Sequence, residues 1–224
     1  MTNSILFIAA DPREFNGFLP HWQQIQPLPL PVHWARTGRW KGREVHAIAN
    51  GAGADRAFAA VLVAPKSAAL CNIGFCGALD ESLQIGDVFV ATKVQDGSRS
   101  WPALQPDDTP DAPTGAVASI DHIAQTAAEK SNLRATGASI VEMEAAGVAR
   151  ASEDLDLPFY CIRAVSDLAR EDFANDFNAA LKPDGRFSTI GLLKQLRLPE
   201  LIRLKQRTDL ASKKLGDFLA ATTF

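Results

Sequence analysis

The sequence lacks the features that mark membrane, nucleic-acid-binding and secreted proteins. Among its 224 residues, no apolar run approaches the roughly 20 residues that a transmembrane helix needs, so we expect no integral membrane segment. No block of lysine or arginine occurs and the net charge is -3, so nucleic acid is not an expected partner. The opening residues, MTNSILFIAADPRE, have neither a basic start nor a long apolar stretch, which predicts no signal peptide.

Cysteine and histidine are both scarce. Cys71, Cys76 and Cys161 lie in apolar surroundings without C-x-x-C spacing. An odd number of such cysteines fits reduced, buried thiols better than a disulfide framework, which favours a cytoplasmic location. The four histidines are scattered without the spacing of metal ligands. We therefore expect no metal site and no cofactor.

The remaining composition is that of an ordinary globular protein. Hydrophobic residues make up 46% and charged residues 22% of a chain long enough for one large core. The longest turn-rich stretch, residues 96–115, holds four prolines and is too short for an interdomain linker. We expect it to be a loop, folded over a site or mobile. The sequence predicts a single domain over residues 1–224.

Short apolar runs alternate with helical patterns along the chain. Buried strands are predicted at Ile5–Ala10 and Leu70–Phe75, with Val88–Val94 as a third central candidate. Further strands are predicted at Val32–Arg36, Glu44–Ala49 and Pro158–Val165. Helices are predicted at Ala54–Ala64, at Ile120–Lys130 with Ser119 as the cap, at Glu142–Leu155, and from Pro199 to about Leu219. This alternation predicts a three-layer α/β fold with a mixed central sheet flanked by helices.

The stretch SIVEMEAAGVA places two carboxylates among apolar residues. On a regular helix, Glu142 and Glu144 point roughly 200° apart, so they cannot serve one site as a matched pair. Either one of them faces a pocket, or both are first-turn residues that the helix dipole favours.

A second polar group follows in the run IRAVSD. Arg163 interrupts an apolar strand, where a cation needs a partner such as Asp167 or a glutamate. Asp167 follows that strand at the end where α/β sheets bind ligands, and the alternative is that it caps the next segment. Glu14 follows the first strand and, on its own, reads as a surface helix residue.

These motifs together carry a family resemblance. VEMEAAGVA followed by IRAVSDLA resembles the nucleoside phosphorylase and nucleosidase superfamily, which includes purine nucleoside phosphorylases and methylthioadenosine/adenosylhomocysteine nucleosidases. NIGFCGALDESLQIGDVFVAT is similar to the strand-turn G-x-x-G and following strand of that family, and NGAGADRAFAA to its helix start. The tail AALKPDGRFSTIGLLKQLRLPELIRLKQ resembles the hopanoid-associated phosphorylase branch, which removes adenine from an adenosyl-hopane precursor.

The resemblance implies a role for each of these residues. Asp167 would be the acid that protonates purine N7 as the base departs, and Glu14 would activate water. Glu144 would accept hydrogen bonds from the ribose hydroxyls. The resemblance also implies substrate contacts for Met143, Glu142, Ser166, Arg163, Phe75, Cys76 and Gly77. It implies cleavage of the N-ribosidic bond of an adenine nucleoside by a homodimer or higher homo-oligomer.

Both water and phosphate are candidates for the nucleophile. Where hexameric phosphorylases of the family clamp phosphate with arginines, this sequence has Glu14 and Asn72, and Phe75 replaces a serine. A carboxylate repels phosphate, which favours water, whereas the hopanoid resemblance favours phosphate as co-substrate. Cations that would compensate are Arg13, Arg39 and Arg56. A methylthioadenosine-type nucleosidase and a non-catalytic nucleoside-binding module, with Phe75 blocking the nucleophile position, are the alternatives.

Overall fold

The computed structural model describes residues 4–173, 176–186 and 198–224. The part of the hopanoid-like tail at 187–197 lies outside these residues. The described strands form one mixed sheet in the order β10-β6-β8-β9-β5-β1-β4-β3-β2, with β7 paired to β6. Their bounds are β1 Ile5–Ala9, β2 Gln23–Pro27, β3 Trp34–Trp40, β4 Arg43–Ala49, β5 Ala69–Ala78, β6 Val88–Gln95, β7 Ser100–Pro102, β8 Thr114–Ser119, β9 Ala138–Glu142 and β10 Phe159–Asp167.

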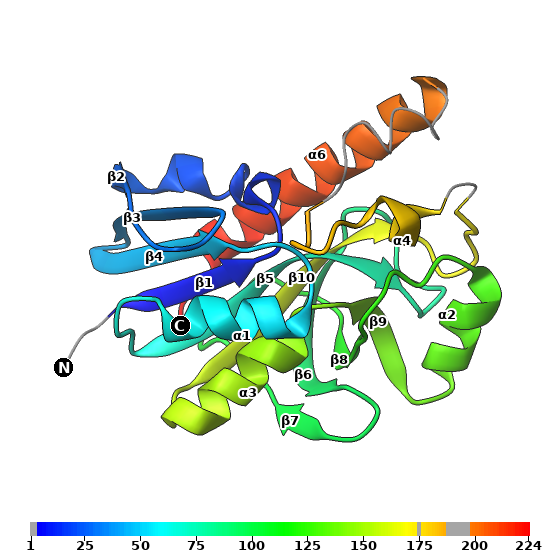
Figure 1. Ribbon diagram of the computed structural model, residues 1–224, viewed down its shortest axis with the longest axis horizontal. Helices are drawn as coiled ribbons and strands as arrows, with labels where there is room; N and C mark the ends of the chain where they lie inside the picture. Colours follow the sequence, from blue (N-terminus) through cyan, green and yellow to red (C-terminus); the bar gives the residue numbers. More distant parts are fainter. Residues whose placement is uncertain (1–3, 174–175, 187–197) are drawn as a thin grey trace.

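Helices cover both faces of this sheet (Figure 1). On one face, α1 (Ala54–Leu62) packs beside α3 (Ala145–Leu155). On the other, the long α6 (Leu198–Ala221) crosses β10 and β5, and its first turns extend beyond the sheet. The shorter helices are η1 Pro12–Phe15, η2 Leu19–His21, α2 Ala127–Arg134 and α4 Phe177–Ala180. This arrangement confirms the predicted three-layer α/β fold with a mixed sheet.

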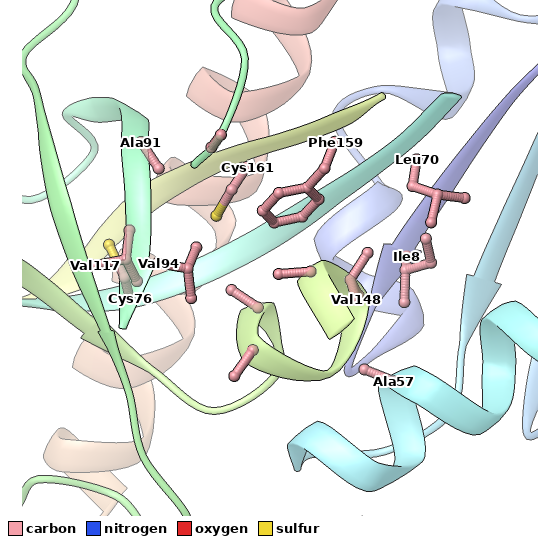
Figure 2. Packing of buried hydrophobic residues seen from close by; sticks show 14 of the residues in the cluster. Ile8, Ala57, Leu70, Cys76, Ala91, Val94, Val117, Val148, Phe159 and Cys161 are labelled. Atoms are coloured by element: carbon pink, nitrogen blue, oxygen red, sulfur yellow. The ribbon is translucent and has the colours of Figure 1, made fainter. Parts of the chain in front are cut away.

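The two-residue period of the strands builds a core on each face. In β1, Leu6 and Ile8 join the cluster beneath α1 and α3, part of which Figure 2 shows. Ile5 and Phe7 point the opposite way and join the cluster beneath α6. Because both faces are covered, the strand reads as a continuous apolar run rather than an alternating one.

Strand β5 lies at the centre of the sheet and positions the site. It runs parallel to β1 and β10, and its last residues, Gly77 and Ala78, pair antiparallel with β9. The ends of β1, β9 and β10 therefore meet around the second half of β5. A bulge between Val165 and Asp167 interrupts the register of β10 at this point.

Two of the predicted helices have the wrong bounds. The helix predicted at 120–130 is in fact α2, which begins at Ala127 with Thr126 as its cap. Ser119 ends β8 instead, and its hydroxyl accepts a hydrogen bond from the Ala146 N–H. Glu142 is not helical but ends β9, because pairing with β8 and β5 holds that segment extended.

The stretch at 96–115 is less irregular than predicted. It contains β7, and the first two residues of β8 fall at its end. Among the described residues, no helix is both long enough and apolar enough to cross a membrane.

Candidate active site

A pocket of about 350 Å³ lies where the ends of β1, β9 and β10 meet around β5. Its volume is at the small end of the range for ligand pockets. It is lined by nine of the residues singled out in the sequence: Glu14, Phe75, Cys76, Gly77, Glu142, Met143, Glu144, Ser166 and Asp167. Arg163 lies behind the wall and is fully buried. These nine residues come from four separate parts of the chain.

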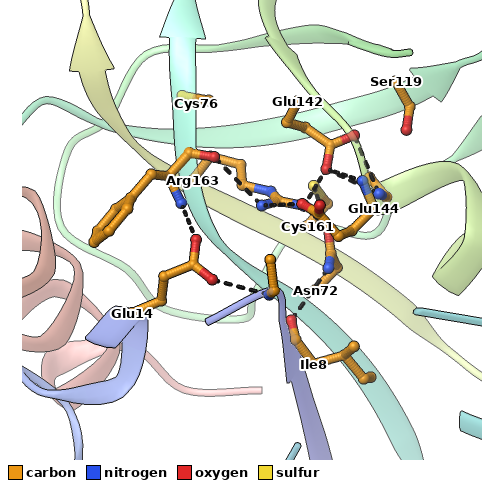
Figure 3. Close-up of polar contacts among 12 residues, drawn as sticks. Ile8, Glu14, Asn72, Cys76, Ser119, Glu142, Glu144, Cys161 and Arg163 are labelled. Atoms are coloured by element: carbon orange, nitrogen blue, oxygen red, sulfur yellow. Dashed lines mark hydrogen bonds and ion pairs between the residues drawn. The ribbon is translucent and has the colours of Figure 1, made fainter. Parts of the chain in front are cut away.

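Local sequence fixes Glu14 in η1, just past the end of β1. Asp11 caps this short helix, Pro12 begins it, and Glu14 completes a capping box. The Glu14 Oε2 accepts hydrogen bonds from the N–H groups of Ala10 and Asp11 at 2.9 Å each. Its Oε1 accepts one from the Phe75 N–H at 2.7 Å (Figure 3). Burial raises the pKa of this carboxyl above its ordinary value.

Arg163 joins the two glutamates of the VEME motif. Its Nη2 contacts the carboxylate of Glu142 and the side-chain oxygen of Asn72, and its Nη1 lies 3.3 Å from Glu144 Oε2 (Figure 3). The prediction that Glu142 and Glu144 point apart on one helix is wrong, because Glu142 is on a strand. Glu142 also accepts hydrogen bonds from the N–H groups of Glu144 and Ala145, where α3 begins. The carboxylate of Glu142 thus neutralises Arg163 and caps α3.

Glu144 has fewer hydrogen-bond partners than Glu142. Its Oε1 accepts a hydrogen bond from the Gly53 N–H at 3.1 Å, so the NGAG turn binds a carboxylate of the protein itself. The φ angle of +116° at Gly53 is one that favours glycine. Burial, partly offset by Arg163, raises the pKa of Glu144 to about 8.

The two glycines of the G-x-x-G turn make room for carboxyl groups. A Cβ at position 74 would lie 2.4 Å from Glu14 Oε1 and 2.6 Å from an Arg163 nitrogen. A Cβ at position 77 would lie 2.8 Å from Asp167 Oδ1. Three residues of a strand span about 10 Å. The two glycines thus let Glu14 and Asp167 approach β5 at points about that far apart along the strand.

Asp167 has two polar neighbours. The Ser166 hydroxyl lies 3.0 Å from Asp167 Oδ2 and 3.1 Å from the Cys76 carbonyl oxygen, so it can donate to either. The ammonium group of Lys130 forms an ion pair with Asp167 Oδ1. Burial nevertheless raises the pKa of Asp167 above its ordinary value, against the opposing effect of Lys130.

Lys130 is a residue that the sequence reasoning missed. It appeared only as the end of a predicted helix, although it is fully buried in the structure. A signal was present, because Lys130 falls between Ala127 and Leu133 on the inner stripe of α2 at helical spacing. A lysine in an apolar stripe needs a buried partner, as Arg163 did in its strand.

The outer part of the pocket comes from segments to which the sequence analysis gave no role in the site. Its apolar lining includes Ile123, Ala124, Phe173, Phe177 and Leu204. The helix α6 adds Arg203, Arg207 and Thr208 to the wall. Of the two alternatives for the 96–115 stretch, the one in which it folds over the site is wrong, because none of its residues lines the pocket.

The arginines considered as phosphate ligands are engaged elsewhere. Arg13 lines the pocket but pairs with Asp11 at 2.8 Å. Arg39 donates to the Gly42 carbonyl oxygen and Arg56 to that of Pro183, and neither lines the pocket.

Metal ligands do not gather at the site. Within residues 4–173, 176–186 and 198–224, no group of three or more His, Cys, Asp or Glu residues is placed to hold an ion. His122 lines the pocket, but its ring lies between Asp121 and Glu129, whose hydrogen bonds raise its pKa.

Comparison with known proteins identifies the family. The 5'-methylthioadenosine/S-adenosylhomocysteine nucleosidase of Staphylococcus aureus is 28% identical over 65% of this chain and 78% of its own length. The fold matches the Streptococcus pneumoniae enzyme of the same name, solved with the transition-state inhibitor MT-ImmA, at a TM-score of 0.74, 20% identity and 97% coverage of both chains. It also matches futalosine hydrolase of Helicobacter pylori at a TM-score of 0.73, 16% identity and 98% coverage of both. The family model described as the phosphorylase superfamily matches residues 4–122 and 106–183, so the chain belongs to the phosphorylase superfamily and is an enzyme.

Proposed function

We propose that this enzyme hydrolyses the N-ribosidic bond of an adenine nucleoside and releases the free base. The observation that carries the proposal is one pocket that holds a buried acid, Asp167, together with the carboxyl groups of Glu14 and Glu144. Cleavage of this bond leaves an oxocarbenium-like sugar and an anionic base. It needs a proton donor on the base side and a nucleophile on the opposite face. No step of this chemistry needs a cofactor.

The proposed roles follow from the environment of each carboxyl group. Asp167 donates a proton to N7 of the base, for which its raised pKa is suited. Glu144 accepts hydrogen bonds from the ribose hydroxyls, while Met143 packs against the sugar. Glu14 accepts the proton of the attacking water, since its raised pKa makes it a stronger base than an exposed glutamate.

Water is favoured over phosphate by the charges around Glu14. Its carboxylate lines the wall where a phosphate would sit, and a dianion there is repelled. Arg163 is already engaged by Glu142 and Glu144, and Arg13 by Asp11. Phosphorolysis is the alternative, and a direct product assay separates the two.

The outer pocket supports a nucleoside with an apolar 5′ substituent. Phe173, Phe177 and Leu204 offer apolar surface, while Thr208 is a polar contact at the same wall. The S. aureus relative is named for 5'-methylthioadenosine, a nucleoside of this kind. An adenosyl-hopane precursor is a larger example, and only its adenosyl end would fit in about 350 Å³.

The domain organisation, oligomeric state and cellular compartment of the enzyme are also proposals. We infer a single domain over residues 1–224 that acts as a homodimer or higher homo-oligomer. The three free, buried cysteines suit a reducing compartment such as the cytoplasm.

The test is adenine release from a panel of adenosine, 5′-methylthioadenosine and an adenosine with a long apolar 5′ chain, with and without phosphate. We expect free adenine and the free sugar, which is ribose from adenosine and the 5-substituted ribose from the other two, at a rate that phosphate does not change. Asp167→Asn keeps the pocket shape but removes the acid, so it should retain the fold and lose at least about 10²-fold in rate.

The outcomes separate the alternatives. A sugar 1-phosphate, with or without the 5′ substituent of the substrate, formed only with phosphate would make the enzyme a phosphorylase. Binding of these nucleosides by calorimetry without adenine release would identify a nucleoside-binding module and refute the proposal. Unchanged turnover in Asp167→Asn would show that Asp167 is not the acid.

A further inference from the structure

Lys130 is a buried cation that has no role in the reaction proposed above. It has no exposed surface, and it is the one residue of α2 that is fully buried. Its ammonium group forms the ion pair with Asp167 and donates to the Leu168 carbonyl oxygen at 2.8 Å. It also lies 5.2 Å from the centre of the Phe173 ring. A buried ammonium is costly unless paired in this way, so these contacts fix its position.

The two oxygens of Asp167 face different surroundings. Lys130 contacts Oδ1, while the polar neighbour of Oδ2 among the described residues is the Ser166 hydroxyl, 3.0 Å away. Asp167 lines the pocket and Lys130 does not. Lys130 therefore reaches the proposed substrate only through Asp167.

Few other charged groups act on this carboxyl. Glu171, from the segment after β10, opposes its ionisation but is itself bound by Arg207 of α6 at 2.7 Å. Cys76 of β5 is a buried thiol whose pKa burial raises well above its ordinary value. Among the groups that the structure describes, Lys130 is thus the cation in direct contact with Asp167.

We propose that Lys130 is a positioning residue that sets the acid strength of Asp167 by stabilising the carboxylate formed when its proton moves to the leaving base. The inference rests on the proposed function. The bond between the sugar and the base breaks, and its electron pair stays on the base. The base takes the proton from Asp167 Oδ2, while water adds to the sugar carbon and yields its proton to Glu14. Negative charge appears on Asp167 in this step, beside the ammonium of Lys130.

The test compares Lys130→Met, which keeps the length of the side chain but removes its charge, with Lys130→Arg. We measure kcat/KM for adenine release against pH in both variants and in the wild type. Without the cation, Asp167 holds its proton more tightly. The alkaline limb of the Lys130→Met profile should therefore move to higher pH, and the plateau should fall at least about tenfold. Lys130→Arg should restore most of the rate and the position of the limb.

A second substrate separates acidity from structure. The p-nitrophenyl riboside releases a stable phenolate that needs no proton, so Lys130→Met should cleave it at nearly the wild-type rate, as should Asp167→Asn. Lys213→Met is the matched control, because it removes an exposed lysine–aspartate pair on α6. It should leave both substrates and the pH profile unchanged.

The outcomes keep the two proposals apart. A Lys130→Met enzyme with the wild-type limb, or with equal losses on both substrates, would make Lys130 merely structural and overturn the inference. If Lys130→Met does not fold, Lys130→Gln carries the same test, since its amide keeps a hydrogen bond to Asp167 without the charge. A wild-type enzyme that releases no adenine would refute the proposed function itself.

Discussion

The buried carboxyl groups of the site show how one residue type takes different roles. Glu142 is held by Arg163 and by two N–H groups at the start of α3. Glu144 shares Arg163, its one N–H partner in the described part of the chain is Gly53, and its pKa is raised to about 8. Glu14 is held by three N–H groups of its surroundings. The partners of each side chain, rather than its position in the motif, decide whether it can exchange protons with a ligand.

Glu14 is the residue that best separates catalysis from binding. In Glu14→Gln, the amide cannot accept a proton from water, so adenine release should fall at least about 10²-fold. Binding of the nucleoside should change little, because the proposed sugar and base contacts belong to Glu144 and Asp167. Saturation kinetics and calorimetry measure the two effects. Glu44→Gln, at an exposed position, is the control, and equal turnover of both variants would contradict the role of Glu14.

The candidate site residues were predicted from sequence motifs, because contacts between distant residues are not visible in a sequence. The resemblance drew attention to Asp167, Glu144 and Glu14, which line one pocket. It did not draw attention to Lys130, because the ion pair with Asp167 joins residues 37 positions apart and no local pattern carries that contact. A buried cation is visible in sequence only as a charge in an apolar stripe.

At the scale of elements, apolar runs predicted that a strand or helix is present better than they predicted where it begins and ends. The run Leu70–Phe75 predicted a strand, but β5 continues to Ala78, because β9 and β10 pair with the turn-like CGA. The helix predicted to start at Glu142 starts three residues later for the same reason. Long-range strand pairing thus overrides local propensity near the site, where the strand ends meet.

Helix α6 holds η1, and with it Glu14, through a contact between two glycines. A Cβ on Gly216 would lie 2.0 Å from the carbonyl carbon of Gly17, which follows η1. Ser212 adds hydrogen bonds on the same side, to the Arg13 carbonyl oxygen at 2.8 Å and from the Gly17 N–H at 3.1 Å. The position of Glu14 therefore depends on close packing of α6.

Gly216→Ala should separate α6 from η1. The added methyl meets backbone, so overpacking should cost about 1–3 kcal/mol, more than the roughly 1 kcal/mol that alanine gains over glycine within a helix. Urea unfolding measures the loss, and adenine release should fall with it because Glu14 shifts. Asp217→Ala, on the exposed side of the same turn, should stay within about 0.5 kcal/mol of the wild type. A Gly216→Ala variant as stable and as active as Asp217→Ala would exclude this dependence.

At the scale of the whole molecule, the sheet order could not be derived from the sequence. Strand β9 lies between β8 and β5, and β5 pairs with three strands that are distant in sequence. Because of this order, Glu14, Glu142, Glu144 and Asp167 all lie in one buried region. Only Arg163 and Lys130 are fully buried cations among the residues described. The carboxyl groups outnumber these cations, and burial raises the pKa values of Glu14, Glu144 and Asp167.

This excess couples stability to pH. Glu144 has a pKa of about 8 in the folded protein against an ordinary value of 4.5, so between these values the folded state binds a proton that the unfolded state releases. Its contribution to the free energy of unfolding is complete below about pH 4.5 and is lost as the pH rises through about 8. The raised pKa values of Glu14, Asp167 and His122 act in the same direction, whereas the lowered values of His33 and His46 act against it.

Glu144→Gln isolates this contribution, because the amide does not titrate while all other groups stay the same. Urea unfolding of both proteins at about pH 5.5 and about pH 8.5 gives the change in the free energy of unfolding for each. The wild type should lose at least about 1.4 kcal/mol more than Glu144→Gln over this interval, which corresponds to a pKa shift of one unit. Parallel pH dependences would mean that Glu144 is ionised in the folded protein. The pH dependence would then come from the other carboxyl groups with raised pKa values, and the wild-type slope should instead flatten in Glu14→Gln or in Asp167→Asn.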